Sequence, residues 1–198
     1  SYVALSQLVR GARIRTLSVA LRLARPPDEE PAGHRRDLAL AGGGCLLDLG
    51  YHAIDLVHFL LQAPLEPVAV TLSRRGQPVR RGEREDRAAL LGRCGETWVR
   101  LDLSAVGTVA IETVEMTTAA DRWQADRCGV RRNAETVYAC PRSWEAAECG
   151  RLAELAAAVA AADASSSEPA DLWDHLAALA VVERAYGMGP AEGLGKRH

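Results

Sequence analysis

Residues 42–55 read Gly42-Gly43-Gly44-Cys45-Leu46-Leu47-Asp48-Leu49-Gly50-Tyr51-His52-Ala53-Ile54-Asp55, a glycine run that opens a helical pattern. The pattern continues to Gln62, and Pro64 ends it. Apolar residues occupy most positions around this predicted helix, so we expect it to be deeply buried. Its polar residues are therefore informative, because burying a polar side chain without a partner is costly.

Three of these polar residues share one face of the predicted helix. Asp48 and His52 are one turn apart, and Asp55 follows on the same face. A carboxylate beside an imidazole favours the protonated ring and fixes which ring nitrogen carries the proton. The pattern thus predicts Asp48 and His52 as an acid–base pair. Gly43 and Gly44 would expose backbone N–H groups to a ligand.

Two other interpretations apply to the same residues. A histidine in a buried helix is often a core residue with a satisfied hydrogen bond, because perturbed groups also serve structure. A metal site would need His58 together with Asp48, His52 and Asp55. His58 lies six positions after His52 and points away from it, so we expect no metal site.

Outside this helix, the chain changes its hydrophobic period twice. Helices are predicted at Tyr2–Arg10, Ser143–Ala162 and Asp171–Tyr186. Alternating patterns predict strands at Arg13–Leu23, Val68–Leu72, Asp86–Leu91, Thr97–Leu103, Thr108–Met116 and Thr136–Tyr138, with a further one around Trp123. Strands so closely spaced, without helices between them, are typical of an antiparallel sheet. We predict one α+β domain over residues 1–198, an open, mainly antiparallel sheet with helices packed on one face.

Composition excludes several classes of protein. The 198 residues include 24 Lys and Arg against 26 Asp and Glu, a formal net charge of −2, which does not suit a polyanion partner. The five cysteines form no Cys-x-x-Cys pair, so reduced thiols are expected. Neither a signal peptide nor a membrane span is evident. We therefore expect a cytoplasmic protein that binds neither nucleic acid nor membrane.

The segment from His34 to Asp55 resembles the signature of the Gfo/Idh/MocA oxidoreductases, a Trp-Arg pair, a spacer, three glycines and then Asp-x-Gly-x-His-x-x-Asp. Three further segments resemble the family's later elements: Arg10–Ile14, Glu85–Ala88 and Ala170–Tyr186. The resemblance covers nearly the whole chain and identifies it as similar to the family's C-terminal, substrate-side domain. His34 replaces the family's usual tryptophan.

The resemblance implies roles for individual residues. Asp48 and His52 would face the substrate, with His52 assisting proton transfer while NAD(P) exchanges hydride. Residues expected to bind substrate are Arg35, Gly43, Gly44, Tyr51 and Asp55. The family's cofactor and a catalytic lysine lie in a preceding Rossmann domain, which these residues do not contain. The only lysine here is Lys196, in the tail. We therefore expect no cofactor site in this chain, and NAD(P) only if an N-terminal domain is missing.

Three functional hypotheses remain open. The first is a cofactor-free acid–base enzyme, an isomerase, lyase or cyclase, acting on a small polar or natural-product substrate. The second is the substrate-binding half of an NAD(P)-dependent sugar or polyol dehydrogenase. The third is a non-catalytic partner that pairs sheet to sheet with a full-length relative; a homodimer through the sheet face is also expected, with Trp98 and Tyr138 as candidate contacts. Taking the chain as complete, we prefer the first.

Overall fold

The computed structural model describes residues 1–26, 33, 41–79, 83–140 and 170–188. Four helices are described: α1 (Tyr2–Leu8), α3 (Cys45–Asp48), α4 (Gly50–Leu61) and α6 (Ala170–Met188). The strands are β1 (Thr16–Arg22), β2 (Glu66–Arg74), β3 (Gln77–Pro78), β4 (Arg87–Cys94), β5 (Thr97–Ser104), β6 (Ile111–Thr117), β7 (Arg122–Asp126), β8 (Gly129–Arg132) and β9 (Glu135–Ala139).

The nine strands form one open sheet in the order β3-β2-β4-β5-β1-β6-β7-β8-β9. All neighbouring strands are antiparallel except β1 and β5, which run parallel with Val19 opposite Leu101. The predicted α+β fold with a mainly antiparallel sheet is confirmed, although the sheet is mixed. The parallel pair arises because β1 inserts between β5 and β6, far from both in sequence.

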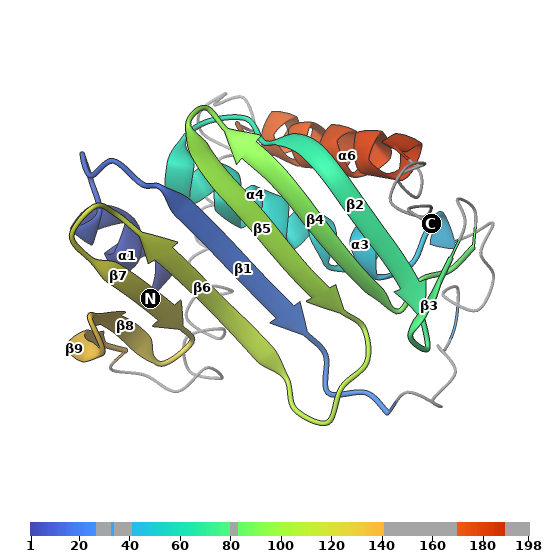
Figure 1. The fold of residues 1–198 in the computed structure, drawn as a ribbon, viewed down its shortest axis with the longest axis horizontal. Helices are drawn as coiled ribbons and strands as arrows, with labels where there is room; N and C mark the ends of the chain where they lie inside the picture. The colour runs from blue at the N-terminus through green and yellow to red at the C-terminus, as the bar shows by residue number, and fades with distance from the viewer. Residues whose placement is uncertain (27–32, 34–40, 80–82, 141–169, 189–198) are drawn as a thin grey trace, which may run out of the picture.

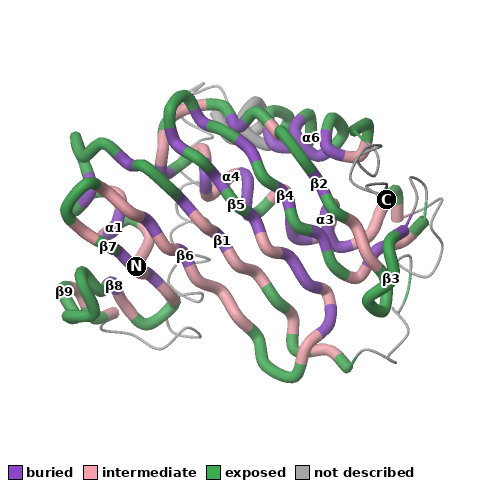
Figure 2. The backbone as a smooth tube through the Cα atoms, in the orientation of Figure 1, coloured by how far each residue is buried: buried purple, intermediate pink, exposed green. Residues whose placement is uncertain are grey.

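The helices α3, α4 and α6 lie on one face of the sheet, and no helix of the described residues covers the other, open face (Figure 1). Strand residues alternate between the two faces, as in β4, where Ala88 and Leu90 are buried and Arg87 and Ala89 are exposed (Figure 2). The buried side chains of the sheet join those of the helices in one hydrophobic core. Within the described parts of the chain, no helix is both long and apolar enough to cross a membrane.

The predicted single helix from Cys45 to Gln62 is wrong in one respect. It is divided at Leu49, which separates α3 from α4. The expected deep burial is also wrong, because α4 packs only one side against the sheet. Its buried residues include Ala53, Ile54 and Val57, whereas His52 is exposed. The apolar residues counted around the helix include Phe59, whose side chain is 41% exposed.

The predicted helix at Ser143–Ala162 lies outside the described residues, as does most of the proline-bearing segment after Pro26. The last predicted helix, Asp171–Tyr186, corresponds to α6. At its other end, the chain begins with α1, which packs near β7, β8 and α4.

Candidate functional site

The predicted acid–base residues lie on two consecutive helices behind the sheet. Asp48 ends α3 and is half-buried, while His52 lies exposed in the first turn of α4. The rings of Tyr51 and His52 are in contact, with centroids 3.8 Å apart and planes tilted by 35°. Asp55 is half-buried one turn further along α4. The histidine thus combines access from solvent with a ring contact that limits its motion.

Backbone hydrogen bonds carry the helical path across the interruption at Leu49. The Asp48 N–H donates to the Gly44 carbonyl at 3.0 Å, and the Leu49 N–H donates to the Cys45 carbonyl at 2.8 Å. The Ala53 N–H then donates to the Leu49 carbonyl at 3.1 Å. The positions of Asp48 and of α4 therefore both depend on the turn that begins at Gly44.

That turn is held by Glu85 and Tyr186, two residues far from it in sequence. The Cys45 N–H donates to the Glu85 carbonyl at 3.2 Å, and the Leu46 N–H donates to Glu85 Oε1 at 2.9 Å. The Gly44 N–H donates to the Tyr186 hydroxyl at 3.2 Å. The protein itself thus supplies acceptors for the N–H groups of Gly44, Cys45 and Leu46, whereas the expected exposure of the Gly43 N–H stays a prediction.

The glycines at this turn make room for the same two residues. A Cβ atom on Gly44 would lie 2.2 Å from the Glu85 carbonyl oxygen, and one on Gly43 would lie 2.5 Å from the Tyr186 hydroxyl oxygen. The close approach that requires glycine is thus made from within the chain. Substrate contact by Gly43 and Gly44 stays a prediction.

Glu85 is a functional candidate that the pattern around the glycine run does not reveal. Its side chain is 1% exposed, and burial raises the pKa of its carboxyl above the usual range. The Tyr186 hydroxyl donates to Glu85 Oε1 at 2.7 Å, and burial together with the Glu85 charge raises the pKa of this phenol. The sequence signals for Glu85 are its place just before the predicted strand Asp86–Leu91 and the resemblance of Glu85–Ala88 to an element of the family.

The other candidate residues separate from this site. Arg35 and His34 lie outside the described residues. Cys45 is buried, its thiol pairs with the Leu103 carbonyl at 3.8 Å, and burial raises its pKa, so the thiol stays protonated. His58 Nε2 accepts a hydrogen bond from the Leu65 N–H at 3.1 Å, which anchors the loop after α4. In the described part of the chain, no three His, Cys, Asp or Glu side chains are grouped to hold a metal ion.

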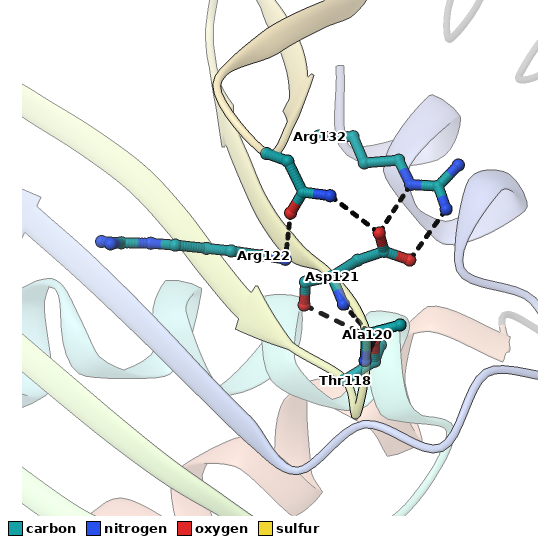
Figure 3. Close-up of polar contacts among 6 residues, drawn as sticks. Thr118, Ala120, Asp121, Arg122 and Arg132 are labelled. Atoms are coloured by element: carbon teal, nitrogen blue, oxygen red, sulfur yellow. Dashed lines mark hydrogen bonds and ion pairs between the residues drawn. The ribbon is translucent and has the colours of Figure 1, made fainter.

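Two further polar regions lie away from the motif helices. A hollow of about 290 Å³ on the open sheet face is lined by residues that include Arg22, Arg87 and Asp102. At the turn after β6, Asp121 accepts hydrogen bonds from Arg132 and Asn133, each at 2.9 Å (Figure 3). The Arg132 hydrogen bonds lower the pKa of Asp121. This cluster joins β7 to β8, and its polar groups form hydrogen bonds with one another.

Comparison with known proteins gives one family and one fold. The family model of the GFO/IDH/MocA C-terminal domain matches residues 8–128. No curated protein matches the sequence. Among solved structures, GenD2 from gentamicin A biosynthesis in complex with NAD is 21% identical, with a TM-score of 0.71 over 94% of this chain and 57% of that chain.

Two other solved structures share the fold at lower identity. One is KijD10, a 3-ketoreductase from Actinomadura kijaniata in complex with NADP, with 16% identity, a TM-score of 0.65 and coverage of 94% and 56%. The other is a myo-inositol dehydrogenase from Corynebacterium glutamicum, with 16% identity, a TM-score of 0.65 and coverage of 94% and 58%. The present chain therefore spans less than three fifths of the length of these proteins.

Proposed function

Because the chain belongs to the GFO/IDH/MocA C-terminal domain family, we propose that it forms the substrate-side domain of an NAD(P)-dependent dehydrogenase or ketoreductase acting on a sugar or polyol. The observation that carries this proposal is the exposed His52 at the start of α4, one turn after Asp48. The solved relatives in complex with NAD or NADP support the redox assignment. The polyol class follows the myo-inositol dehydrogenase, and the sugar class follows another solved structure of this fold, the WlbA dehydrogenase in complex with NADH and UDP-GlcNAcA.

In this proposal, His52 exchanges a proton with a substrate hydroxyl or carbonyl oxygen. Asp48 stabilises the charged ring and orients it, and the Tyr51 ring supports it from the side at 3.8 Å. Tyr51 and Asp55, with Arg35, Gly43 and Gly44, are proposed to bind the substrate. An exposed histidine suits this role only if the bound substrate, or another domain, excludes water from it.

The glycine turn of this chain does not fit a dinucleotide. Its N–H groups at Gly44, Cys45 and Leu46 already have acceptors, and the buried Glu85 carboxyl beside them would oppose a phosphate. We propose that a cofactor is held by another part of the enzyme. NAD(P) held there would supply the hydride acceptor or donor.

Cofactor-free acid–base chemistry by Asp48 and His52 is the second candidate. The half-buried Asp48 and the exposed His52 on consecutive helices support it, because a carboxylate and an imidazole can by themselves exchange protons with a substrate. Isomerisation, elimination or cyclisation of a small polar substrate would then be the reaction class.

The test compares turnover of the protein purified from its native source across a panel of sugars and polyols, with NAD⁺, with NADP⁺ and without either. His52→Ala and Asp48→Asn should each lower turnover by roughly 10²–10⁴-fold, the usual contribution of a general acid or base. The control is His58→Gln, which changes a histidine of the same helix but keeps an acceptor for the Leu65 N–H.

The outcomes separate the two candidates. Turnover that requires NAD(P) and is lost in the His52 and Asp48 variants supports the dehydrogenase. Turnover without NAD(P) that is lost in the same variants supports the cofactor-free enzyme. Unchanged turnover in both variants would exclude both candidate functions.

We further propose a cytoplasmic homodimer that pairs through the open sheet face.

A further inference from the structure

A buried carboxyl group, that of Glu85, contacts the first turn of α3. Glu85 is one of three buried polar or charged residues in the described chain, and at 1% exposure it is the least exposed of them. Its segment is fixed to the sheet, since the Asp86 N–H donates to the Ser73 carbonyl at 3.0 Å and the Ala105 N–H donates to the Asp86 carbonyl at 2.8 Å. Glu85 is therefore a fixed point against which another element can be set.

Glu85 uses that position to hold the Gly44–Leu46 turn at two places. Its backbone carbonyl accepts from the Cys45 N–H, and its side chain accepts from the Leu46 N–H. Tyr186 of α6 adds a third contact, because its hydroxyl accepts from the Gly44 N–H and donates to Glu85 Oε1. The Glu85 carboxyl group thus joins three parts of the fold: the sheet-anchored segment that carries it, the helix α6 and the Gly44–Leu46 turn.

Backbone hydrogen bonds connect this turn to Asp48 and His52, the two residues that are proposed to react. The Gly44 carbonyl accepts from the Asp48 N–H, and the Cys45 carbonyl accepts from the Leu49 N–H. Leu49 in turn accepts from the Ala53 N–H, so the start of α4, which carries His52, follows the same path. A shift at Gly44 would therefore displace Asp48 and His52.

The arrangement is costly for a purely stabilising contact. Among the described residues, no hydrogen-bond partner is found for the buried Glu85 Oε2, which lies 2.5 Å from the place where a Gly44 Cβ would stand. Desolvating a carboxyl and leaving one oxygen unpaired opposes folding, and an apolar side chain would avoid this cost. An apolar side chain could not accept from the Leu46 N–H and from Tyr186 at once. The carboxyl therefore fixes the geometry of the turn but lowers the stability of the folded protein.

From these contacts we propose that Glu85 and Tyr186 are positioning residues, which fix the Gly44–Leu46 turn and through it the placement of Asp48 and His52. This inference rests on the proposed function for its catalytic meaning. The hold on the turn itself rests only on the hydrogen bonds, and the two are tested separately.

The test uses two tyrosine-to-phenylalanine substitutions of the same kind. Tyr186→Phe removes the hydroxyl that joins Glu85 to Gly44. Its matched control is Tyr2→Phe, which removes a part-buried hydroxyl that donates to Glu112 Oε1 at 3.0 Å, between α1 and β6. Both variants lose one tyrosine–glutamate hydrogen bond, but only Tyr186→Phe loses it at the turn.

Two readouts need no substrate. In Tyr186→Phe, amide hydrogen exchange at Gly44 and Leu46, followed by NMR, should become roughly 2- to 10-fold faster, the effect of one hydrogen bond. The NMR signals of the His52 ring should shift in the same variant. Tyr2→Phe should change neither. Glu85→Gln, which keeps an acceptor oxygen for Leu46 and Tyr186, should retain the wild-type His52 signals.

Turnover then decides the catalytic meaning. If Tyr186→Phe lowers kcat more than it changes KM while Tyr2→Phe leaves both unchanged, the positioning role is supported. Unchanged exchange and unchanged His52 signals in Tyr186→Phe, or equal changes in both tyrosine variants, would overturn it. If exchange and signals change as expected but His52→Ala retains full turnover, the proposed function fails and the positioning role fails with it, although the hold on the turn stands.

Discussion

Glu85 couples protonation to folding, because its carboxyl is buried. Burial raises its pKa, so the folded protein binds this proton more tightly than the unfolded chain does. The stability linked to it is fully present below the unfolded value of about 4.3 and is lost as pH rises through the folded pKa. A tenfold difference in proton affinity corresponds to about 1.4 kcal/mol.

Glu85→Gln should therefore become more stable relative to wild type as pH rises from about 4 to about 8. The measurement is the free energy of unfolding in urea at a series of pH values. Thr97→Val serves as control, because Thr97 is also buried, with a hydroxyl that donates to the Ile14 carbonyl at 2.9 Å, and does not titrate. The coupling would be contradicted if the difference in unfolding free energy between Glu85→Gln and wild type depended on pH as little as that of Thr97→Val.

The sequence alone could point to Asp48 and His52, because their spacing and the residue types are local. It could not show that Glu85 and Tyr186, which lie in two segments that resemble the family's elements, meet the glycine turn from 39 and 142 residues away. Nor could it show that His52 is exposed, since an apolar pattern does not reveal which side of a helix is left uncovered. The chemistry is encoded locally, while its support depends on tertiary contacts.

At the scale of elements, the turn into α3 is the most tightly constrained link between sheet and helices. Gly44→Ala would place a Cβ 2.2 Å from the Glu85 carbonyl oxygen and 2.5 Å from Oε2. Because one of these atoms belongs to the backbone of a sheet-anchored segment, the turn must shift. We expect a loss of about 1–3 kcal/mol in the free energy of unfolding, the usual cost of overpacking.

Gly187→Ala is the matched control for that substitution. Gly187 lies in α6, and no atom of the described residues outside its own stretch of helix stands within 4 Å of the place its Cβ would take. Alanine there should stabilise the protein by roughly 0.5–1 kcal/mol, because it restricts the unfolded chain and favours helix. Thermal or urea unfolding of the two variants measures both. Equal stability of Gly44→Ala and wild type would show that the turn adapts.

Most strands could be predicted within a few residues, because alternation is a local signal; β5 was predicted at Thr97–Leu103 and lies at Thr97–Ser104. The strands β3 and β8 were missed, since they have two and four residues and too few positions to alternate. The insertion of β1 beside β5 was also not predictable. Strand order depends on pairing between distant segments, and no local pattern records it.

At the scale of the whole molecule, the described helices leave one face of the sheet uncovered (Figure 1). Trp98 is 43% exposed there, with the Arg93 guanidinium 5.0 Å from its ring centroid, and Leu91 is 40% exposed nearby. Tyr138, the other candidate contact, is opposite the buried Val130 and packs against the core instead. A second copy meeting the same face about a two-fold axis would cover these apolar groups.

The proposed homodimer predicts a mass in solution of about twice the 21.3 kDa of one chain, measured by sedimentation equilibrium. Leu91→Arg should weaken self-association by at least about tenfold, because it replaces an exposed apolar side chain of the open face with a cation that the proposed contact would bury. Val3→Arg is the control, a charge added at a 60% exposed position of α1, away from the open face. A wild-type monomer at micromolar concentration would exclude the dimer. If both variants dissociate it, α1 also contributes to the interface. If only Leu91→Arg does, pairing through the sheet face accounts for the dimer, and the exposed His52 of α4 lies on the opposite face of the sheet.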